Sequence, residues 1–484
     1  MKKLTDILKN TPVREVCGDT AAAIGGLVYD SRAVKPGDCF FAVPGTQSDG
    51  HDYIPMAVEK GAAAIVCERM PADAAEGVAY VLVGDSAGAM ADMAAAFYDY
   101  PSRELKLVGI TGTNGKTTTA TLLYDLVRAM GYKAGLISTV VYKIDGREVE
   151  ATHTTPDSIR LNAMMREMAD AGCAYCFMEC SSHAIVQERT RGLDFAGGIF
   201  SNITHDHLDY HKTFAEYIRA KKLFFDGLPK GAFALTNADD RNGRVMVQNT
   251  AAAVSAYSLR AMADFRCKIV EMHLNGMLLR IDGQELWVGL LGRFNAYNLL
   301  AVYGAAALLG LDRGEVLRVL SMLHAVSGRF EKIRAANGTT AIVDYAHTPD
   351  ALENVIQTIE EIRTPGQQLI VVCGCGGDRD RTKRPEMAAI AVKYATTAVF
   401  TSDNPRHESP EAILDDMVAG LEPGARYLRI ADRAEAIRTA VMLSRPGDII
   451  LVAGKGHETY QIVGDVKHPF DDREEIKKRF ALLN

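Results

Sequence analysis

Short apolar runs alternate with amphipathic segments along almost the whole chain. In the first hundred residues the run CFFAVP is followed by the helix-like YIPMAVEKG and then by the run AAAIVCE. An Ala/Met-rich helix is expected around residues 86 to 99. Strands that are separated by helices predict a small α/β domain over residues 1–100, with a boundary near Pro101.

The same alternation continues in two further blocks. From Leu105 the strand-like LKLVGIT leads to a glycine loop and the helical TTTATLLYDLVRAMG, and similar units extend to about Leu323. The segment VSGRF is expected to be a connector, because strand-like TTAIVDYAH, QQLIVVCGC, ATTAVFTSD and GDIILVAGKG follow it. The pattern predicts an α/β fold of three domains, with helix-covered parallel sheets over residues 101–327 and 328–484.

Composition and charge exclude several classes of protein. The 484 residues are 48% hydrophobic and 24% charged, which is ordinary for a folded chain with several cores. The net charge of −7 is spread without a basic stripe, so no nucleic-acid partner is expected. No apolar run reaches the roughly 18 residues of a membrane span, and charged residues interrupt the N-terminal MKKLTDILKN. We therefore expect a cytoplasmic protein.

Cysteine usage indicates reduced thiols. The nine cysteines are odd in number and scattered, unlike a disulfide framework. Cys173, Cys176, Cys180 and His183 have a spacing that zinc could use. The segment AYCFMEC is more typical of a buried strand, so we expect Cys176 and Cys180 to be small apolar fillers.

The segment TGTNGKTT, residues 111–118, is the strongest chemical signal. It lies between a strand ending at Ile110 and a long helix, where backbone N–H groups and a helix N-terminus favour phosphate. The strict P-loop has glycine at the position of Ile110, so this loop is a variant in which Gly112 supplies flexibility. We predict that ATP is bound by Gly112, Thr113, Asn114, Gly115, Lys116, Thr117 and Thr118.

Two polar residues end apolar segments further along: Glu179 in CFMECSSHA and His207 in GGIFSNITHDHLDYH. Each suits a Mg²⁺ ligand or a general base, and each could equally be a solvated loop residue. In the helix FAEYIRAKKLFFDGL, Lys221 falls on the apolar stripe and Lys222 on the polar side. The Lys221 stem could simply snorkel to solvent. Alternatively, a buried lysine that has lost its proton can react with CO2 to form a carbamate, an anionic metal ligand.

Taken in order, TGTNGKTT, ECSSHA, SNITHDHLDYH and the helix lysine resemble the motifs of the Mur ligases, which add amino acids to the peptidoglycan precursor using ATP. The resemblance covers essentially the whole chain and implies a monomer. It implies ATP as co-substrate and two Mg²⁺ ions held by Thr117, Glu179, His207 and Lys221, the last as a carbamate. It gives catalytic roles to Lys116, Lys221, Glu179 and His207. It also places Asn298, Arg329 and Asp344 against the nucleotide.

Further resemblances concern the precursor. Tyr29, Ser31 and the loop Thr46, Gln47 and Ser48 resemble the uridine-nucleotide site of members that extend the muramoyl dipeptide, although such residues also occur in ordinary turns. His153 stands where the family often has asparagine. Contacts to the dipeptide are implied for Thr154, Thr155, Ser181, Gln187 and Arg189.

Three predicted strands of the last domain end in polar loops. Because ligands of open α/β sheets bind beyond the carboxyl ends of strands, these loops should form one pocket. Its arginines and carboxylates suit an amino acid with two carboxylates and two ammonium groups, although a solvated rim would look similar. The DNPR motif resembles that of members that add meso-diaminopimelate. The residues concerned are Arg379, Asp403, Asn404, Pro405, Arg406, Gly454 and Glu458.

The implied reaction is amide formation through an acyl phosphate, with UDP-N-acetylmuramoyl-L-alanyl-D-glutamate and meso-diaminopimelate as small-molecule substrates. Alternatives are a relative that adds L-lysine or D-Ala-D-Ala, or a folate polyglutamylating enzyme. DNPR together with GKGHE favours diaminopimelate. A different class is a P-loop regulatory ATPase or binding protein that senses a wall precursor without ligating it.

Overall fold

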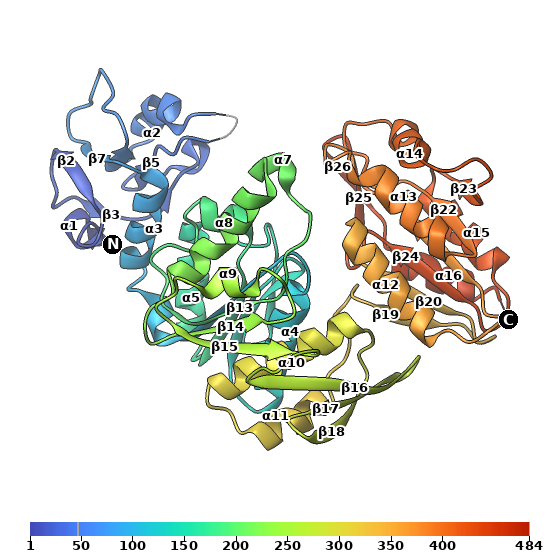
Figure 1. The fold of residues 1–484 in the computed structure, drawn as a ribbon. Coiled ribbons are helices and arrows are strands. Elements are labelled where there is room, and N and C mark those ends of the chain that lie inside the picture. Colours follow the sequence, from blue (N-terminus) through green and yellow to red (C-terminus); the bar gives the residue numbers. More distant parts are fainter. Residues whose placement is uncertain (46–47, 484) are drawn as a thin grey trace.

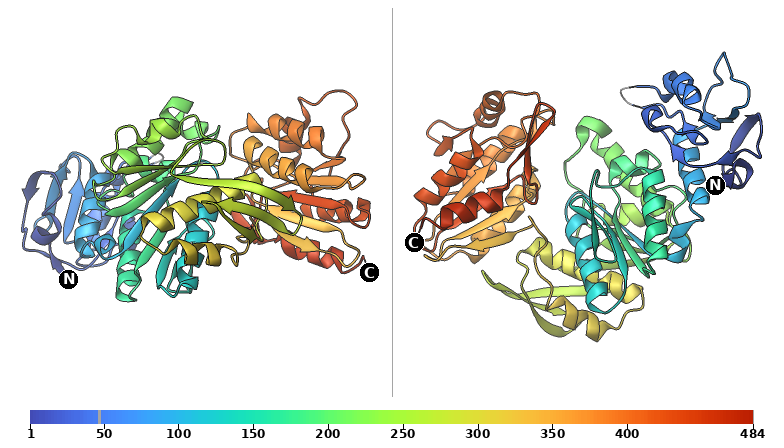
Figure 2. Two further views of the ribbon diagram at one scale, coloured as in Figure 1. Left: turned by 60° about the horizontal axis from the view of Figure 1, so that its bottom comes forward. Right: turned by 180° about the vertical axis from the view of Figure 1, so that it is seen from behind.

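The computed structural model describes residues 1–45 and 48–483. Three α/β domains follow one another, from the blue N-terminal domain through the central one to the orange C-terminal one (Figure 1). The two outer domains lie on opposite sides of the central domain in both views of Figure 2. The predicted fold class is therefore confirmed.

The N-terminal domain is built on a five-stranded sheet of order β2-β7-β6-β5-β4. The expected Ala/Met-rich helix is α3, Ser86–Phe97, whose first turn is capped by the Asp85 carboxylate. The short 3-10 helix Pro101–Glu104 then leads into the central domain. The other elements are β1 Lys2–Lys3, α1 Leu4–Ile7, β2 Val13–Cys17, β3 Ala23–Ile24, β4 Leu27–Val28, β5 Cys39–Phe41, α2 Ile54–Glu59, β6 Ala64–Cys67 and β7 Ala79–Val83.

The central sheet has eleven strands in the order β11-β10-β9-β12-β8-β13-β14-β15-β16-β17-β18. Its strands are β8 Lys106–Thr111, β9 Ala134–Ile137, β10 Val141–Ile144, β11 Arg147–Glu150, β12 Tyr175–Glu179, β13 Phe195–Phe200, β14 Phe233–Asn237, β15 Ala253–Ser258, β16 Phe265–His273, β17 Gly276–Ile281 and β18 Gln284–Val288. β12 and β13 flank β8 in parallel, so the carboxyl ends of these three strands lie side by side.

The expectation of a parallel central sheet holds for the seven neighbouring strands β9-β12-β8-β13-β14-β15-β16. It is wrong at both edges of the sheet. β10 and β11 form an antiparallel hairpin, as do β17 and β18. Each hairpin turns at an Asp-Gly pair with positive φ at both residues, Asp145–Gly146 and Asp282–Gly283. This is the geometry of a tight two-residue turn, which cannot accommodate the crossover helix that parallel pairing needs.

Helices cover both faces of the central sheet. Successive β8 residues alternate, because Val108 packs in a core with α4 and α10 while Leu107 packs with α5 and α8. A Cβ on Gly109 would come within 2.5 Å of the Phe224 ring, so this glycine lets α8 approach closely. The helices are α4 Lys116–Ala129, α5 Ser158–Asp170, α6 Ser182–Val186, α7 Leu208–His211, α8 Phe214–Asp226, α9 Gly243–Val247, α10 Arg293–Leu308 and α11 Arg313–Leu320.

The C-terminal sheet has the order β19-β20-β24-β21-β22-β23 and is parallel apart from β19. The four predicted strands are present, and β24 lies between β20 and β21. The elements are β19 Glu331–Arg334, β20 Thr340–Asp344, α12 Pro349–Ile362, β21 Leu369–Cys373, α13 Lys383–Tyr394, β22 Thr397–Phe400, α14 Pro410–Val418, β23 Tyr427–Arg429, α15 Arg433–Leu443, β24 Ile449–Ala453, β25 Tyr460–Val463, β26 Val466–Pro469 and α16 Asp472–Phe480.

The cysteines and the helices of the described residues bear on two predictions for the whole chain. Cys173, Cys176 and Cys180 are buried in or beside β12, as apolar fillers should be. Among residues 1–45 and 48–483, no helix combines the length and the apolar character that crossing a membrane requires.

Candidate active site between the central and C-terminal domains

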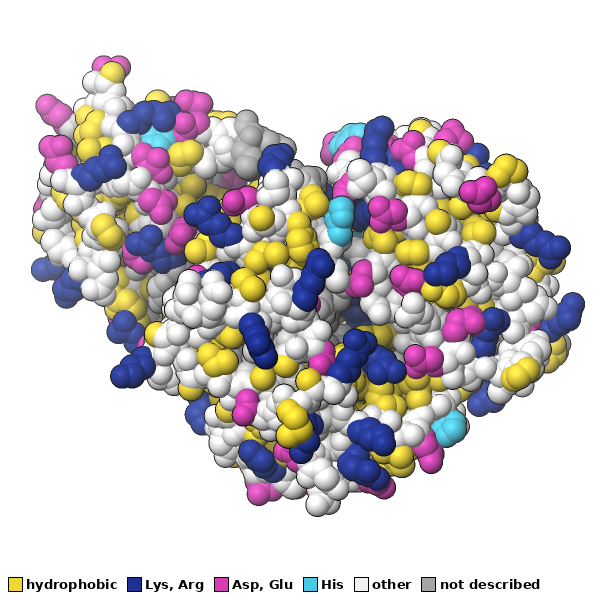
Figure 3. All heavy atoms as spheres, in the orientation of Figure 1, with side chains coloured by type: hydrophobic (Ala, Val, Ile, Leu, Met, Phe, Trp, Pro, Cys, Tyr) yellow, Lys and Arg dark blue, Asp and Glu magenta, His cyan; other side chains and the backbone are white. Residues whose placement is uncertain are grey.

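A cavity of about 530 Å³ is lined by residues 113–118 of the segment TGTNGKTT, by the ends of β12 and β13, and by residues between 344 and 355 of the C-terminal domain. The central and C-terminal domains are divided by a notch on the face drawn in Figure 3. The lining therefore brings together residues from two domains, including most of those that the sequence assigns to nucleotide and metal.

The nucleotide loop has the backbone that a phosphate cradle needs. Gly112 and Gly115 have φ of 152° and 87°, a region that favours glycine. A Cβ on Gly112 would overlap the hydroxyl oxygen of Ser201, which follows β13. Asn202 fixes the loop, since its carbonyl accepts the N–H of Thr113 at 2.8 Å.

Two lysine amines converge on one carbonyl oxygen. Nζ of Lys116 lies 2.9 Å from the Gly112 oxygen, and Nζ of Lys221 lies 2.7 Å from the same atom. Lys221 is 1% exposed on the buried face of α8, as predicted, whereas Lys222 pairs with Asp226 at 2.6 Å. Burial, followed by the charge of Lys116, lowers the pKa of Lys221 well below its usual range.

Glu179, His207 and Thr117 line the same cavity as Lys221. Glu179 ends β12, is 1% exposed, and accepts the backbone N–H of Thr139 at 2.7 Å. Burial lowers the pKa of His207 to about 4. Among the described residues, no group of three or more His, Cys, Asp and Glu side chains could hold a metal by itself. A metal here would thus need donors of other kinds as well, such as the Thr117 hydroxyl.

The other predicted nucleotide residues also reach the cavity. A Cβ on Gly115 would lie 2.5 Å from Oδ1 of Asn298, so α10 packs directly under the loop. Arg329 donates to the Thr117 hydroxyl at 3.2 Å and stacks on the ring of Tyr345. The Asp344 carboxylate accepts two backbone N–H groups, and burial raises its pKa.

Sequence reasoning missed Asp350. Its carboxylate accepts the Asn114 side-chain amide at 2.9 Å and thereby joins the nucleotide loop to α12 of the C-terminal domain. Asp350 lies in the first turn of α12 after Pro349, where an acidic residue is common for reasons of helix stability alone. The local sequence therefore carried no signal of this contact.

The residues predicted to contact the dipeptide form one connected group beside Glu179. Arg189 donates to the Thr155 carbonyl at 2.7 Å and to the Gln187 side chain at 2.6 Å. Thr155 in turn donates to the Glu179 carbonyl at 2.7 Å. The complete group is Thr154, Thr155, Ser181, Gln187 and Arg189.

The first-domain residues are less closely grouped. Burial and the charge of Asp157 raise the pKa of Tyr29, while the charge of Arg189 lowers it. Ser31 is buried, with its hydroxyl 3.4 Å from the sulfur of Met56. Ser48 and the side chain of His153 are exposed. Thr46 and Gln47 lie outside the described residues.

The three C-terminal loops meet, as their strand ends predict. Asn404 donates to the Glu458 carboxylate at 2.9 Å, and Arg406 donates to the Gly377 carbonyl at 2.8 Å. A Cβ on Gly454 would lie 2.5 Å from the Asp403 carboxylate. Burial and then the charge of Arg379 lower the pKa of Arg406, and the side chains of both arginines lie against Gly376.

Lys455 is a further member of this group that sequence reasoning missed. Its side chain is fully buried, and its amine donates to Asn404 at 3.0 Å and to Glu458 at 2.9 Å. The residue lies between Gly454 and Gly456, and a lysine in such a glycine-rich loop is expected to be exposed to solvent.

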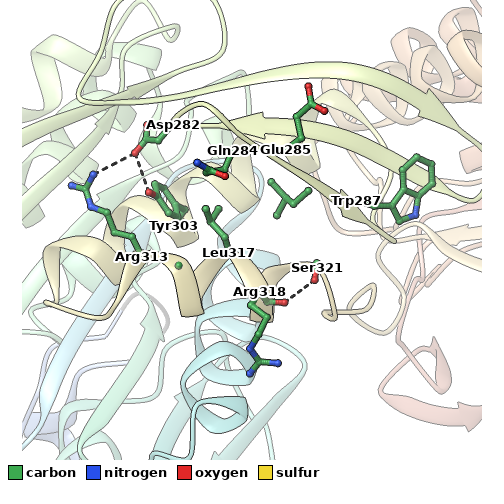
Figure 4. A pocket seen from close by; sticks show the side chains of 11 residues that line it. Asp282, Gln284, Glu285, Trp287, Tyr303, Arg313, Leu317, Arg318 and Ser321 are labelled. Atoms are coloured by element: carbon green, nitrogen blue, oxygen red, sulfur yellow. Dashed lines mark hydrogen bonds and ion pairs between the residues drawn. The ribbon is translucent and has the colours of Figure 1, made fainter.

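A second hollow, of about 860 Å³, lies between β18 and α11 (Figure 4). Its Asp282 accepts from Tyr303 and pairs with Arg313 at 3.5 Å. None of the residues assigned to chemistry above lines it. The cavity at the nucleotide loop is therefore the candidate active site.

Comparison with known proteins agrees with this geometry. Family models described as "Mur ligase family, catalytic domain", "Mur ligase middle domain" and "Mur ligase, glutamate ligase domain" match residues 23–98, 110–306 and 328–456. Two curated relatives, from Phocaeicola vulgatus and Bacteroides fragilis, are each named UDP-N-acetylmuramoyl-L-alanyl-D-glutamate--2,6-diaminopimelate ligase. Both are 55% identical to this chain, with 99% of each chain covered.

Solved structures show the same fold. A structure titled as a UDP-N-acetylmuramoyl-L-alanyl-D-glutamate--2,6-diaminopimelate ligase superimposes with a TM-score of 0.71 at 31% identity, covering 100% of this chain and 99% of the other. A folylpolyglutamate synthase from Mycobacterium tuberculosis has a TM-score of 0.62 at 18% identity over 75% of this chain and 91% of its own, and shares the fold alone. The family models and the full-length relatives establish that this chain belongs to the Mur ligase family.

Proposed function

We propose that this chain is the ATP-dependent ligase that joins meso-diaminopimelate to UDP-N-acetylmuramoyl-L-alanyl-D-glutamate. The observation that carries the proposal is Arg406, a half-buried arginine beside Arg379, where three loops that also hold Glu458 meet. Two neighbouring cations suit a substrate with an additional carboxylate. Relatives with 55% identity carry the name of this activity.

In the first step the γ-carboxylate of the dipeptide's D-glutamate attacks the γ-phosphorus of ATP. A carboxylate oxygen–phosphorus bond forms, the bond to the β,γ-bridging oxygen breaks, and ADP leaves. Lys116 neutralises charge on the transferring group after its amine turns from the Gly112 carbonyl toward the phosphates. Arg329, which contacts Thr117, is placed to add a second positive charge.

The residues present fit two Mg²⁺ ions, which Thr117, Glu179, His207 and a carbamylated Lys221 would hold. The fit rests on Lys221, a fully enclosed amine that shares its carbonyl partner with Lys116. Attack of the neutral amine on CO2, with loss of one proton, would place an anionic oxygen ligand beside the Lys116 amine. Bound Mg²⁺ supplies positive charge that stabilises phosphoryl transfer.

In the second step an amine of diaminopimelate attacks the acyl carbon. Phosphate leaves, the nitrogen loses a proton, and the amide bond is complete. The C-terminal loops hold the amino acid, with Arg406 at its distal carboxylate and the carboxylates of Asp403 and Glu458 at its ammonium groups. Because these loops and the nucleotide loop lie in different domains, the domains have to close for the two substrates to react.

We also propose that the enzyme works as a monomer in the cytoplasm. All candidate residues come from one chain, so no second copy is needed to complete the site. The cysteines of the described chain are free, which suits a reducing compartment.

The test is a ligation assay with product mass as the readout. Purified protein receives Mg-ATP and the UDP-linked dipeptide, together with diaminopimelate, lysine or no amino acid. We expect a product heavier by one diaminopimelate residue, and phosphate release that depends on both the dipeptide and the amino acid. Phosphate release without a ligated product would instead favour a precursor-sensing ATPase.

A further inference from the structure

Glu408, two residues after Arg406, is the most heavily engaged carboxylate around the three C-terminal loops. One of its oxygens accepts the backbone N–H of Asp378 at 2.6 Å and a guanidinium N–H of Arg384 at 2.8 Å. The other oxygen accepts from Arg381 at 2.7 Å and again from Arg384 at 3.0 Å. The Glu408 side chain is only 12% exposed, so water cannot easily replace these partners.

Arg384 anchors this carboxylate from the first turn of α13. Its side chain is fully buried, and it also donates to Asp416 of α14 at 2.7 Å and to the Gly376 carbonyl at 3.2 Å. A buried guanidinium requires such partners, because a buried charge without a partner is strongly destabilising. Arg384 and Glu408 therefore tie the loop after β21 to the loop after β22.

The segment that they tie is the one against which Arg406 rests. Gly377 donates its N–H to the Asn404 carbonyl at 2.9 Å, and its own carbonyl accepts from the Arg406 guanidinium at 2.8 Å. A Cβ on Gly377 would overlap the Pro405 carbonyl oxygen, so the two loops touch backbone to backbone. Any displacement of Gly377 would thus move the Arg406 side chain.

The backbone of Arg406 is itself held by the β25–β26 hairpin. Its N–H donates to the Ile462 carbonyl at 3.1 Å, and its carbonyl accepts from Gly464 at 2.7 Å. Arg406 has a φ of 51°, a left-handed conformation that is unfavourable for arginine and needs such support. With the backbone fixed by the hairpin, the direction of the guanidinium depends on the segment Gly376–Asp378.

We propose that Glu408 is a positioning residue for diaminopimelate selection. Its carboxylate, anchored by Arg384, holds Gly376–Asp378 where the Gly377 carbonyl aims the Arg406 guanidinium at the distal carboxylate of the amino acid. The inference rests on the proposed function and adds a residue that does not touch the substrate. An arginine that is aimed in advance loses less side-chain entropy when it binds a carboxylate.

Glu408→Gln is the variant that tests this role. Glutamine keeps the shape but leaves only one oxygen for four N–H donors, so the Gly376–Asp378 segment loses its anchor. We expect the KM for diaminopimelate to rise about tenfold or more, as for the loss of one charge-assisted contact. The KM for ATP should stay within about twofold, because the nucleotide cavity contains neither loop. The preference for diaminopimelate over lysine should narrow.

Glu411→Gln is the matched control. Glu411 lies three residues further on in α14, is exposed, and pairs only loosely with Arg429 at 3.6 Å. The control makes the same chemical change and should leave both KM values as in the wild type. Glu408→Asp keeps the charge on a shorter side chain and should give a diaminopimelate KM between those of wild type and Glu408→Gln. If Glu408→Gln does not fold, Glu408→Asp is the variant whose diaminopimelate KM tests the proposal.

The outcomes separate this inference from the function on which it rests. A folded Glu408→Gln that ligates diaminopimelate with unchanged KM and preference would overturn the positioning role. Equal increases in the KM for ATP and for diaminopimelate would also overturn it, since they indicate a general structural defect. A wild-type protein that forms no diaminopimelate product would overturn the proposed function itself, whatever the variants do.

Discussion

At the scale of single residues, the most unusual feature is the meeting of Lys116 and Lys221 at the Gly112 carbonyl. The two lysines differ in what surrounds them. Lys116 begins α4 directly after the nucleotide loop, whereas Lys221 is 1% exposed and its amine lies 4.6 Å from the centre of the Tyr217 ring. We therefore expect the Lys116 side chain to turn toward a bound nucleotide, and the Lys221 amine to keep its position.

Lys116→Ala should abolish ligation without unfolding the protein. The loop keeps its backbone contacts to Asn202, but the transferring phosphoryl group loses a positive charge. A loss of several kcal/mol of transition-state stabilisation corresponds to on the order of a thousandfold or more in rate. Turnover of ATP, together with circular dichroism of the variant, measures this. Near-normal turnover in a folded variant would contradict the assignment.

Lys221→Ala and Lys222→Ala are adjacent and should differ strongly. Lys221→Ala should lose most activity, and a small carboxylate such as acetate should restore part of it by supplying the missing oxygen ligand. Lys222 pairs with Asp226 within α8 and does not line the cavity, so its loss should be mild. Equal losses in the two variants, or no added mass of CO2 on the protein, would count against the carbamate.

Glu408 should make part of the stability depend on pH. Hydrogen bonds from Arg384, its strongest partner, lower the Glu408 pKa from 4.5 to about 2. Because the folded-state pKa is lowered, the stabilisation is present above about pH 4.5 and is lost as pH falls toward about 2. A shift of this size corresponds to at most about 3 kcal/mol. The gap in unfolding free energy between wild type and Glu408→Gln should thus be wide at pH 7 and should shrink as the pH falls from about 4.5 toward about 2. A gap independent of pH would contradict this.

At the scale of secondary-structure elements, the sequence predicts the elements better than their order. The strands before TGTNGKTT, before Glu179 and before each C-terminal loop are all visible as apolar runs. Local sequence patterns cannot predict which strands are neighbours, for example that β12 pairs with β8 or that β24 lies between β20 and β21. These pairings join residues that are far apart in the chain. They determine which of the polar loops that follow the strands lie next to one another.

Some misses had a local signal. The Asp-Gly pairs at residues 145–146 and 282–283 mark the antiparallel hairpins at the sheet edges. The local sequence carried no signal of the buried contacts of Arg384, because a charged residue in the first turns of a helix is usually exposed to solvent. Lys221 could be predicted because the apolar stripe of α8 fixes which face of the helix is buried.

Contact between the loops after β21 and β22 can be tested through Gly377. In Gly377→Ala the added methyl would overlap the Pro405 carbonyl, so the loops have to separate. We expect a raised KM for diaminopimelate, by about tenfold, with little change in the KM for ATP. Gly420→Ala, where the nearest neighbour is a side-chain carbon of Pro385 at 3.5 Å, is the control in the same domain. Equal effects of the two variants would show that contact between these loops does not matter for the amino acid.

At the scale of the whole molecule, the chemistry is divided between domains. The central domain holds the nucleotide loop and the dipeptide residues, whereas the C-terminal domain holds the loops around Arg406. The links between them are single contacts such as Asn114 with Asp350 and Thr117 with Arg329. Contacts between domains depend on how whole sheets are oriented, so the sequence could predict the three domains but not these links. The proposed limits at residues 100 and 327 stay a prediction.

The central claim is that Arg406 makes this enzyme select diaminopimelate over lysine. In the most direct measurement, wild type and Arg406→Ala each receive Mg-ATP, the UDP-linked dipeptide and both amino acids at equal concentration. Mass spectrometry then gives the ratio of the diaminopimelate product to the lysine product. Wild type should form almost only the diaminopimelate product, since the lost contact is worth about 1.5 to 3 kcal/mol, or roughly 10- to 150-fold. Arg406→Ala should form less product with a narrowed preference. Equal use of the two amino acids by wild type, or full discrimination by the variant, would contradict the account.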